Sequence, residues 1–163
     1  GDAAMKLLAL VLLAAWSTAT SAADLKPEVI QWGVSAEKIR AAVTPQCKKG
    51  ALERPIEPPF LPNVKTGQVQ VDCSGFPFLG APRWTEFVVG DDRLQMVWIM
   101  VRAEDRDAAV AALTEAYGPP SSSNENSIAF KQGRAAWRHK PPEILFYAPE
   151  LDTWVEPWFE GKE

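Results

Sequence analysis

The chain contains one histidine, and this limits the catalytic arrangements that the sequence can support. His139 lies between Arg138 and Lys140, and any base–nucleophile pair that needs an imidazole has to use it. Ser121 to Ser123 fall in a polar segment, and no G-x-S-x-G sequence surrounds a serine. A histidine between two basic residues at a strand end is ordinarily an exposed structural residue. The sequence therefore gives no indication of nucleophilic hydrolysis.

Two groups of acidic residues have the composition of a cation site or of a general acid and base. Asp91 and Asp92 follow a glycine, and Glu104, Asp105 and Asp107 precede an apolar helical pattern. Aspartate beside glycine is common in tight turns, and carboxylates in the first turn of a helix complement the helix dipole. Both groups thus have a structural explanation, and no phosphate-binding loop or dinucleotide fingerprint occurs. We expect no metal and no cofactor, and catalysis by acidic residues is the alternative function rather than the first.

The sequence has 2 cysteines, Cys47 and Cys73, which we expect to form a disulfide. An even number of cysteines in an exported chain is typical of a disulfide framework. Metal binding would need further ligands, and a C-x-x-C redox pair does not occur. The bridge would tie the first helix to the first strand and close a proline-rich loop.

Tryptophan is the residue type that exceeds expectation, with 7 in the chain. Tryptophan offers a large contact area and is enriched in binding hot spots. Chain ends usually lie at the surface, so the aromatic tail is the best candidate for a binding site. The alternative is that the tail folds back and closes an open edge of the core. The candidate residues for binding a partner or ligand are Trp154, Trp158, Phe159, Trp84 and Trp137.

The N-terminal segment has the layout of a secretory signal peptide. After residues 1–4, which we exclude from the mature fold, Lys6 precedes the apolar run from Leu7 to Trp16 and a stretch of small residues. This predicts a signal peptide over residues 5–23, with cleavage after Ala23 or, as the close alternative, after Ala22. A retained membrane anchor is the other interpretation, but the apolar run is about half the roughly 20 residues that span a bilayer. We expect a periplasmic or secreted protein without a membrane span after cleavage.

Composition and charge limit the classes of partner. The chain has 163 residues, of which 47% are hydrophobic and 23% charged, and a formal net charge of −4. These values are typical of one globular domain, which we expect over residues 24–163. An acidic chain with interspersed charges lacks the basic surface that nucleic acid or an anionic membrane requires. A nucleic-acid partner is therefore not expected.

A hairpin at the centre of the chain gives the clearest strand prediction. Residues 85–89 are mainly β-branched or aromatic, residues 94–101 form an apolar run broken only by Gln95, and Gly90 to Arg93 supplies turn-forming residues between them. The period of two places Leu94 on one face with the even-numbered residues Met96, Trp98 and Met100. Because both faces are apolar, we expect the second strand to be central and covered on both sides.

Two helices are predicted from their apolar spacing and their caps. The first opens with Ser35 as N-cap and ends near Pro45, and the second runs from about Glu104 to Tyr117 before Gly118. The four prolines within residues 48–67 indicate a linker or a long ordered loop. Residues 76–84 are expected to form a loop, and residues 121–126 a polar and mobile one.

The order of these elements predicts the fold class. A second hairpin is expected over residues 128–139 and a further strand over residues 143–148. The sequence therefore reads as an α+β fold of two tandem α-β-β-β units with antiparallel sheet, over residues 33–101 and 103–148, with helices packed on one face. Residues 149–163 form a C-terminal tail.

The layout resembles a group of small exported α+β proteins. The residues that carry the resemblance are Trp32-Gly33-x-Ser35 opening a helix, Gly90 to Leu94 in a hairpin, Leu113 to Pro119, and Trp137 in a late strand. The helix-then-meander order is similar to the β-lactamase-inhibitor-like and outer-membrane assembly lipoprotein group. This chain lacks the lipid-bearing cysteine, and each unit has one helix where that fold usually has two. The resemblance implies a binding or assembly role.

The sequence thus predicts an exported, non-catalytic binding or envelope-assembly module. Its partner would be a protein of the cell envelope or a small apolar ligand. The alternatives are a small envelope enzyme of hydrolase type that uses acidic residues, and a carrier of an apolar or sugar ligand on an aromatic groove.

Overall fold

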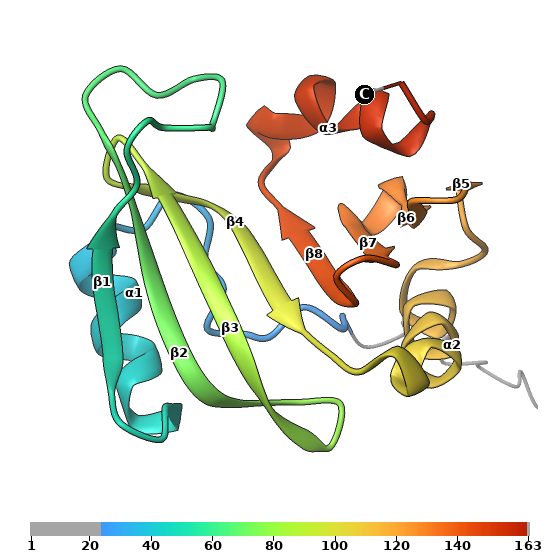
Figure 1. The fold of residues 1–163 in the computed structure, drawn as a ribbon, viewed down its shortest axis with the longest axis horizontal. Helices are drawn as coiled ribbons and strands as arrows, with labels where there is room; N and C mark the ends of the chain where they lie inside the picture. Colours follow the sequence, from blue (N-terminus) through green and yellow to red (C-terminus); the bar gives the residue numbers. More distant parts are fainter. Residues whose placement is uncertain (1–23, 163) are drawn as a thin grey trace, which may run out of the picture.

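The computed structural model describes residues 24–162, which form an antiparallel sheet of eight strands with three α-helices (Figure 1). The strand order across the sheet is β1-β2-β3-β4-β8-β7-β6-β5. The strands are β1 (Ala51–Pro55), β2 (Gln68–Phe78), β3 (Ala81–Gly90), β4 (Arg93–Met100), β5 (Ser122–Ser123), β6 (Ser127–Phe130), β7 (Ala135–Arg138) and β8 (Glu143–Tyr147). The helices are α1 (Ala36–Val43), α2 (Arg106–Tyr117) and α3 (Asp152–Phe159).

The α+β class is confirmed, but the strand count differs from the prediction. α1 precedes the meander β1–β4 and α2 precedes the meander β5–β8, so that each helix is followed by four strands rather than three. The last strands of the two meanders pair at the centre of the sheet, where Met96 lies opposite Tyr147 and Ile99 opposite Ile144. The two strands that the sequence did not predict, β1 and β5, are the two edges of the sheet.

The helix ends follow the predicted capping. Ser35 is the N-cap of α1, and its Oγ accepts a hydrogen bond from the backbone N–H of Lys38 at 3.2 Å. α1 gives way at Thr44 to a short 3-10 turn that contains Pro45. α2 ends at Gly118, whose φ of 83° is a conformation that residues with a side chain rarely adopt.

One face of the sheet, the helix-covered face, carries the larger hydrophobic core. α1 and α2 pack on this face and bury their apolar side chains against strand residues such as Phe87, Val97 and Phe146. Cys47 and Cys73 form the predicted disulfide at the margin of this core, with their Cα atoms 5.1 Å apart. The bridge joins the segment after α1 to β2, and its presence indicates an oxidising compartment.

The opposite face, the groove face, is covered by segments that the sequence did not predict to have this role. α3 packs Val155 and Phe159 onto it, the 3-10 turn before α3 adds Leu151, and the loop of residues 56–67 adds Leu61. The prediction that the helices pack on one face is therefore wrong for α3. The tail instead folds back onto the core, as the alternative interpretation of the sequence predicts, because α3 covers the sheet over β6, β7 and β8.

Four local predictions need correction. Residues 76–84, predicted as a loop, form the tip of the long β2–β3 hairpin, and residues 48–67 contain the edge strand β1. A bulge at Val88 and Val89 places Leu94 opposite Val89. Leu94 therefore joins the helix-covered core, and does not share a face with Met96 and Trp98. Residues 121–126, predicted as a loop, contain β5.

Among residues 24–162, no helix is long and apolar enough to cross a membrane. The predicted signal peptide of residues 5–23 and the excluded residues 1–4 lie outside the described residues.

Candidate ligand-binding groove

A cleft lies on the groove face where neither α3 nor the loop of residues 56–67 covers the sheet. It has a volume of about 380 Å³, and we call it the outer cleft. In Figure 1 the loop and α3 both lie toward the top of the sheet, on either side of β4. The outer cleft is lined by Phe60, Gln70, Glu86, Met96, Trp98, Met100, Arg138, Pro141, Glu143, Trp154 and Trp158.

A second cavity, the inner chamber, lies under α3 and has a volume of about 210 Å³. Trp98, Arg138 and Trp158 line both cavities, so the two adjoin at these side chains. We call the outer cleft and the inner chamber together the aromatic groove. The inner chamber is lined by Trp98, Asn126, Ser127, Ala136, Arg138, Leu145, Trp158 and Phe159.

The strand register brings the lining residues together. Alternate residues of a strand point to the same face, and the antiparallel pairing sets Trp98 opposite Glu86 on β3 and opposite Leu145 on β8. In the next row, Glu143 lies opposite Met100 and Arg138. Side chains from five strands, β2, β3, β4, β8 and β7, therefore form the floor of the outer cleft.

An ion pair lies at the junction of the two cavities. The guanidinium of Arg138 lies 4.3 Å from the centre of the Trp98 ring, a cation–π contact, and forms an ion pair with Glu143. The side chain of Glu143 is only 1% exposed. Burial raises the pKa of Glu143 to about 7, although the charge of Arg138 opposes this shift and that of Glu86 adds to it.

Two polar atoms of residues that line the inner chamber are buried without a hydrogen-bond partner. Both the Oγ of Ser127 and the Nε of Arg138 are in this state, and the two residues lie opposite each other in the β6–β7 pairing. A buried donor without a partner is uncommon in native proteins and costs free energy. Both residues line the inner chamber, where their polar atoms are enclosed without a partner.

The aromatic wall of the groove comes from α3. Trp154 and Trp158 are four residues apart, on the same side of the helix, and their ring centres lie 4.5 Å apart in an edge-to-face arrangement. Arg134 holds the start of α3 through two hydrogen bonds to Asp152, of 2.8 and 2.9 Å. The wall is thus fixed to the second meander.

The opposite rim of the groove is held by Asp91. Its carboxylate accepts hydrogen bonds from the backbone N–H groups of Lys65, Thr66 and Gly67 and from the hydroxyl of Thr66. These bonds, chiefly those from Thr66, hold the pKa of Asp91 well below its usual range. The predicted turn residue therefore also anchors the loop that carries Phe60.

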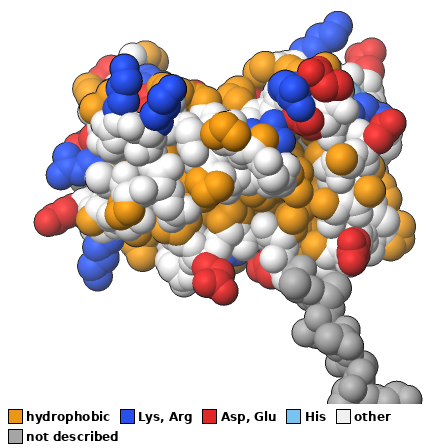
Figure 2. Space-filling model, turned by 90° about the horizontal axis from the view of Figure 1, so that it is seen from below, with side chains coloured by type: hydrophobic (Ala, Val, Ile, Leu, Met, Phe, Trp, Pro, Cys, Tyr) orange, Lys and Arg blue, Asp and Glu red, His pale blue; other side chains and the backbone are white. Residues whose placement is uncertain are grey.

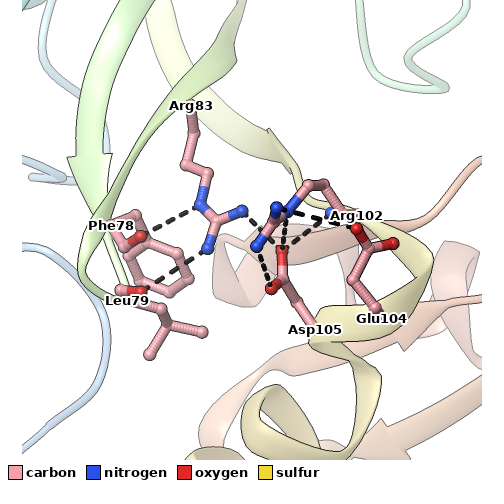
Figure 3. Close-up of polar contacts among 6 residues, drawn as sticks. All are labelled: Phe78, Leu79, Arg83, Arg102, Glu104 and Asp105. Carbon is pink, nitrogen blue, oxygen red and sulfur yellow. Dashed lines mark hydrogen bonds and ion pairs between the residues drawn. The ribbon is translucent and has the colours of Figure 1, made fainter.

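The carboxylates of Glu104 and Asp105, which precede α2, form ion pairs with arginine side chains, as Figure 3 shows. Asp105 accepts hydrogen bonds from Arg102 and from the buried Arg83 at 2.7 Å, while Arg83 also donates to the carbonyl oxygens of Phe78 and Leu79. Arg102 and Arg83 hold the pKa of Asp105 well below its usual range. Across the described part of the chain, no three His, Cys, Asp or Glu residues are grouped so as to hold a metal ion. This cluster joins the β2–β3 hairpin to α2.

Some of the candidate binding residues predicted from the sequence meet in the groove. Trp154 and Trp158 line it, and Phe159 lines the inner chamber although it is only 3% exposed. Trp84 is 44% exposed and donates from its indole N–H to Glu86 at 3.2 Å, which places it beside the outer cleft without lining it.

Trp137 does not join the groove. It is 1% exposed in the helix-covered core, because its neighbours on β7, Ala136 and Arg138, take the groove face and strand residues alternate. His139, which was predicted to be exposed, is partly buried and accepts a hydrogen bond from the Trp137 indole at 3.1 Å.

The sequence did not identify several residues of the groove. The sequence predicts Trp98 only as part of a covered central strand, and it gives no indication that Ser127, Arg138 and Glu143 line a binding site. One signal was present, since Glu143 is a charged residue that opens an otherwise apolar strand, EILFY. Its partner Arg138 could be found only from the β7–β8 register.

The lower surface of the molecule carries no continuous basic stripe. Seen from below, apolar side chains occupy the middle of this surface, and lysine, arginine and carboxylate side chains lie toward its periphery (Figure 2). This distribution agrees with the formal net charge of −4.

No protein family model, curated protein or solved structure matches the chain. The interpretation of the groove therefore rests on its own geometry and chemistry.

Proposed function

We propose that the protein is an exported, non-catalytic binding module whose binding site is the aromatic groove. The observation that carries the proposal is the groove itself, in which Trp98, Trp154 and Trp158 line two adjoining cavities, and in which other lining residues hold buried polar atoms without a partner. Concave, mainly apolar sites with a few convergent polar groups are typical of ligand binding. Half-buried tryptophans offer contact area without a large entropy cost on binding.

The place of action that we propose is the periplasm or the extracellular space. The disulfide supports an oxidising compartment, and the expected signal peptide of residues 5–23 supplies the route. A role in envelope assembly follows from the resemblance to exported assembly proteins. The same resemblance, with the helix-then-meander order of both halves, supports our inference that the halves are tandem units.

The proposal can be tested by site-specific photo-crosslinking in cells that export the protein. A photoreactive p-benzoylphenylalanine at Phe60, which is 45% exposed at the rim of the groove, is expected to give an adduct. The second substitution Met100→Trp should remove this adduct by filling the outer cleft. Mass spectrometry of the adduct distinguishes a small ligand from a protein.

A matched control separates groove binding from nonspecific contact. Leu52→Trp adds the same side chain at a position that is 67% exposed on the edge strand β1 and does not line the groove. This variant should leave the Phe60 adduct intact. An adduct that survives Met100→Trp, or no adduct at all, would show that the groove is not the binding site.

A carrier of a small apolar or sugar ligand is the second candidate function. The observation in its favour is the inner chamber, whose walls include the buried residues Ala136, Leu145 and Phe159. An adduct mass below that of a protein would select this function over protein assembly.

Acid–base catalysis is the third candidate, and it rests on Glu143. A buried carboxyl group with a raised pKa in a cleft is a feature of active sites as well as of structural ion pairs. Its ion pair with Arg138 and its burial favour the structural role. A panel of chromogenic esters and glycosides tests the alternative, since hydrolysis that Glu143→Gln abolishes without loss of ligand binding would establish an enzyme.

A further inference from the structure

We propose that the inner chamber binds a small, neutral, largely apolar molecule through one hydrogen-bond-accepting oxygen, which Ser127 and Arg138 hold. This inference rests on the proposed function, because it assumes that the aromatic groove is a binding site, and it names the class of ligand. A ketone, an ester and an amide all carry such an oxygen.

The walls of the inner chamber suit an apolar body. Trp98, Ala136, Leu145 and Phe159 are all buried and contribute indole, methyl, isobutyl and phenyl surfaces. The volume of about 210 Å³ accommodates a small molecule rather than a folded segment of a protein. Removing an apolar body from water into such walls is favourable in proportion to the area buried.

The polar end of the chamber suits an acceptor. The side chain of Ser127 is 7% exposed, and neither its Oγ nor the Nε of Arg138 has a hydrogen-bond partner. An Arg Nε–H can only donate, and a serine hydroxyl can donate. Because the two residues are opposite each other on β6 and β7, one ligand oxygen with two lone pairs can accept from both.

The charges at the junction favour a neutral head group. Arg138 is already paired with Glu143, so the pair needs no further counter-ion. A ligand carboxylate in the inner chamber would add a negative charge beside the adjoining outer cleft, which Glu143 and Glu86 line. A ligand ammonium would meet the Arg138 guanidinium and would leave both donors without an acceptor.

Four probes of one shape test the head-group chemistry: acetophenone, ethylbenzene, benzoate and benzylammonium. Binding to the full chain is measured by titration, with the indole N–H resonances of Trp98 and Trp158 as reporters of the chamber. We expect acetophenone to bind about five- to tenfold more tightly than ethylbenzene, since it satisfies two buried donors. Benzoate and benzylammonium should bind more weakly than acetophenone.

Two variants test whether the preference for acetophenone over ethylbenzene comes from the inner chamber. Ser127→Ala should lower the affinity for acetophenone several-fold toward that of ethylbenzene and leave ethylbenzene binding unchanged. Ala136→Leu should abolish binding of all four probes by filling the chamber, whereas Ala111→Leu, the same change at an exposed position of α2, should have no effect. If Ala136→Leu does not fold, Ser127→Ala alone decides.

Three results would overturn this inference. These are equal affinity for acetophenone and ethylbenzene, an acetophenone preference that survives Ser127→Ala, and tighter binding of a charged probe. Failure of all four probes to bind would also overturn it. If the Phe60 adduct still disappears with Met100→Trp, only the ligand class is wrong and the proposed function stands, whereas loss of both results removes both proposals.

Discussion

The two faces of the sheet are covered in different ways, and the difference separates stability from recognition. On the helix-covered face, α1 and α2 lie over a continuous core that includes Phe87, Val97 and Phe146. On the groove face, α3 and the loop of residues 56–67 cover the two ends and leave a cleft between them. The first arrangement buries a continuous core, and the second leaves room for a ligand between its two covering segments.

Buried polar side chains are more frequent on the groove face, although Arg83 and Thr85 are buried on the helix-covered face. Gln70, Asp72, Ser127 and Glu143 are buried and take the groove face by the strand register. A polar group in a core is costly unless it is paired, so its presence at a site of low packing is more readily explained by recognition than by stability. We infer that the groove face gives up some packing to carry these groups.

The largest expected effect comes from a pair of neighbours that point to opposite faces. Phe146 is fully buried in the helix-covered core, whereas Leu145 lines the inner chamber. Phe146→Ala should lower the free energy of unfolding by about 4 kcal/mol, and Leu145→Ala by about 2 kcal/mol because it borders space that is already empty. Urea denaturation measures both values. A loss at Leu145 as large as that at Phe146 would contradict the division between the faces.

The disulfide should have the next largest effect. It closes a segment with a sequence separation of 26, and chain entropy assigns such a cross-link about 3 kcal/mol. The double variant Cys47→Ser and Cys73→Ser should therefore melt at a lower temperature while it keeps the ligand-binding properties of the groove, since both cysteines lie at the helix-covered core. Calorimetry and probe titration check the two statements. Lost binding in the folded variant would show that the faces are coupled.

A smaller effect distinguishes the aromatic residues of α3. Trp154 and Trp158 are partly buried and line the groove, while Phe159 packs on Tyr147 with ring centres 6.0 Å apart. Trp154→Ala should lower the free energy of unfolding by about 1 kcal/mol, and Phe159→Ala by about 3 kcal/mol. Thermal unfolding compares the two variants. The reverse order would identify Trp154 as a core residue and remove it from the binding site.

The last effect is a pH dependence that comes from Glu143. Its pKa is raised from 4.5 to about 7, so between these values the folded state binds more protons than the unfolded state. The contribution of Glu143 to the free energy of unfolding is therefore fully present below about pH 4.5 and is lost as the pH rises to 7. The free energy of unfolding falls by about 1 kcal/mol for each pH unit in this range. The pKa values of Asp91 and Asp105 are lowered, so these two groups change the free energy of unfolding only at lower pH.

The control for the pH dependence is Glu143→Gln, which cannot titrate. The free energy of unfolding of the unchanged protein and of the variant is measured by denaturation from pH 4.5 to 7.5. Its dependence on pH should differ between the two proteins from pH 4.5 to 7 and should be the same above pH 7. Equal slopes throughout would show that the carboxyl of Glu143 is ionised at all of these pH values.

Most of the inner fold was predictable from the sequence, and the edges were not. The six inner strands have apolar residues on at least one face, which gives a period that can be recognised. β1 is exposed at four of its five positions, and β5 has only two residues. An edge strand of this kind has no hydrophobic pattern and is defined only by the backbone of its neighbour.

The site was predictable in part for a related reason. The aromatic content of the tail identified Trp154 and Trp158, but Pro157 and the short length of α3 concealed the helix that positions them. The pairing of Arg138 with Glu143 and the opposition of Ser127 and Arg138 depend on strand register. Register comes from the whole sheet, and a single segment of sequence does not contain it.

The anchoring of the loop by Asp91 has a consequence for the speed of ligand exchange. Four donors on residues 65–67 meet one carboxylate, and Gln68 also accepts from the backbone N–H groups of Phe60 and Leu61. The rim of the groove is therefore in place before a ligand arrives, and binding does not wait for a segment to close. Entry is then limited by diffusion and desolvation, and differences in affinity between ligands should lie in how long each one stays.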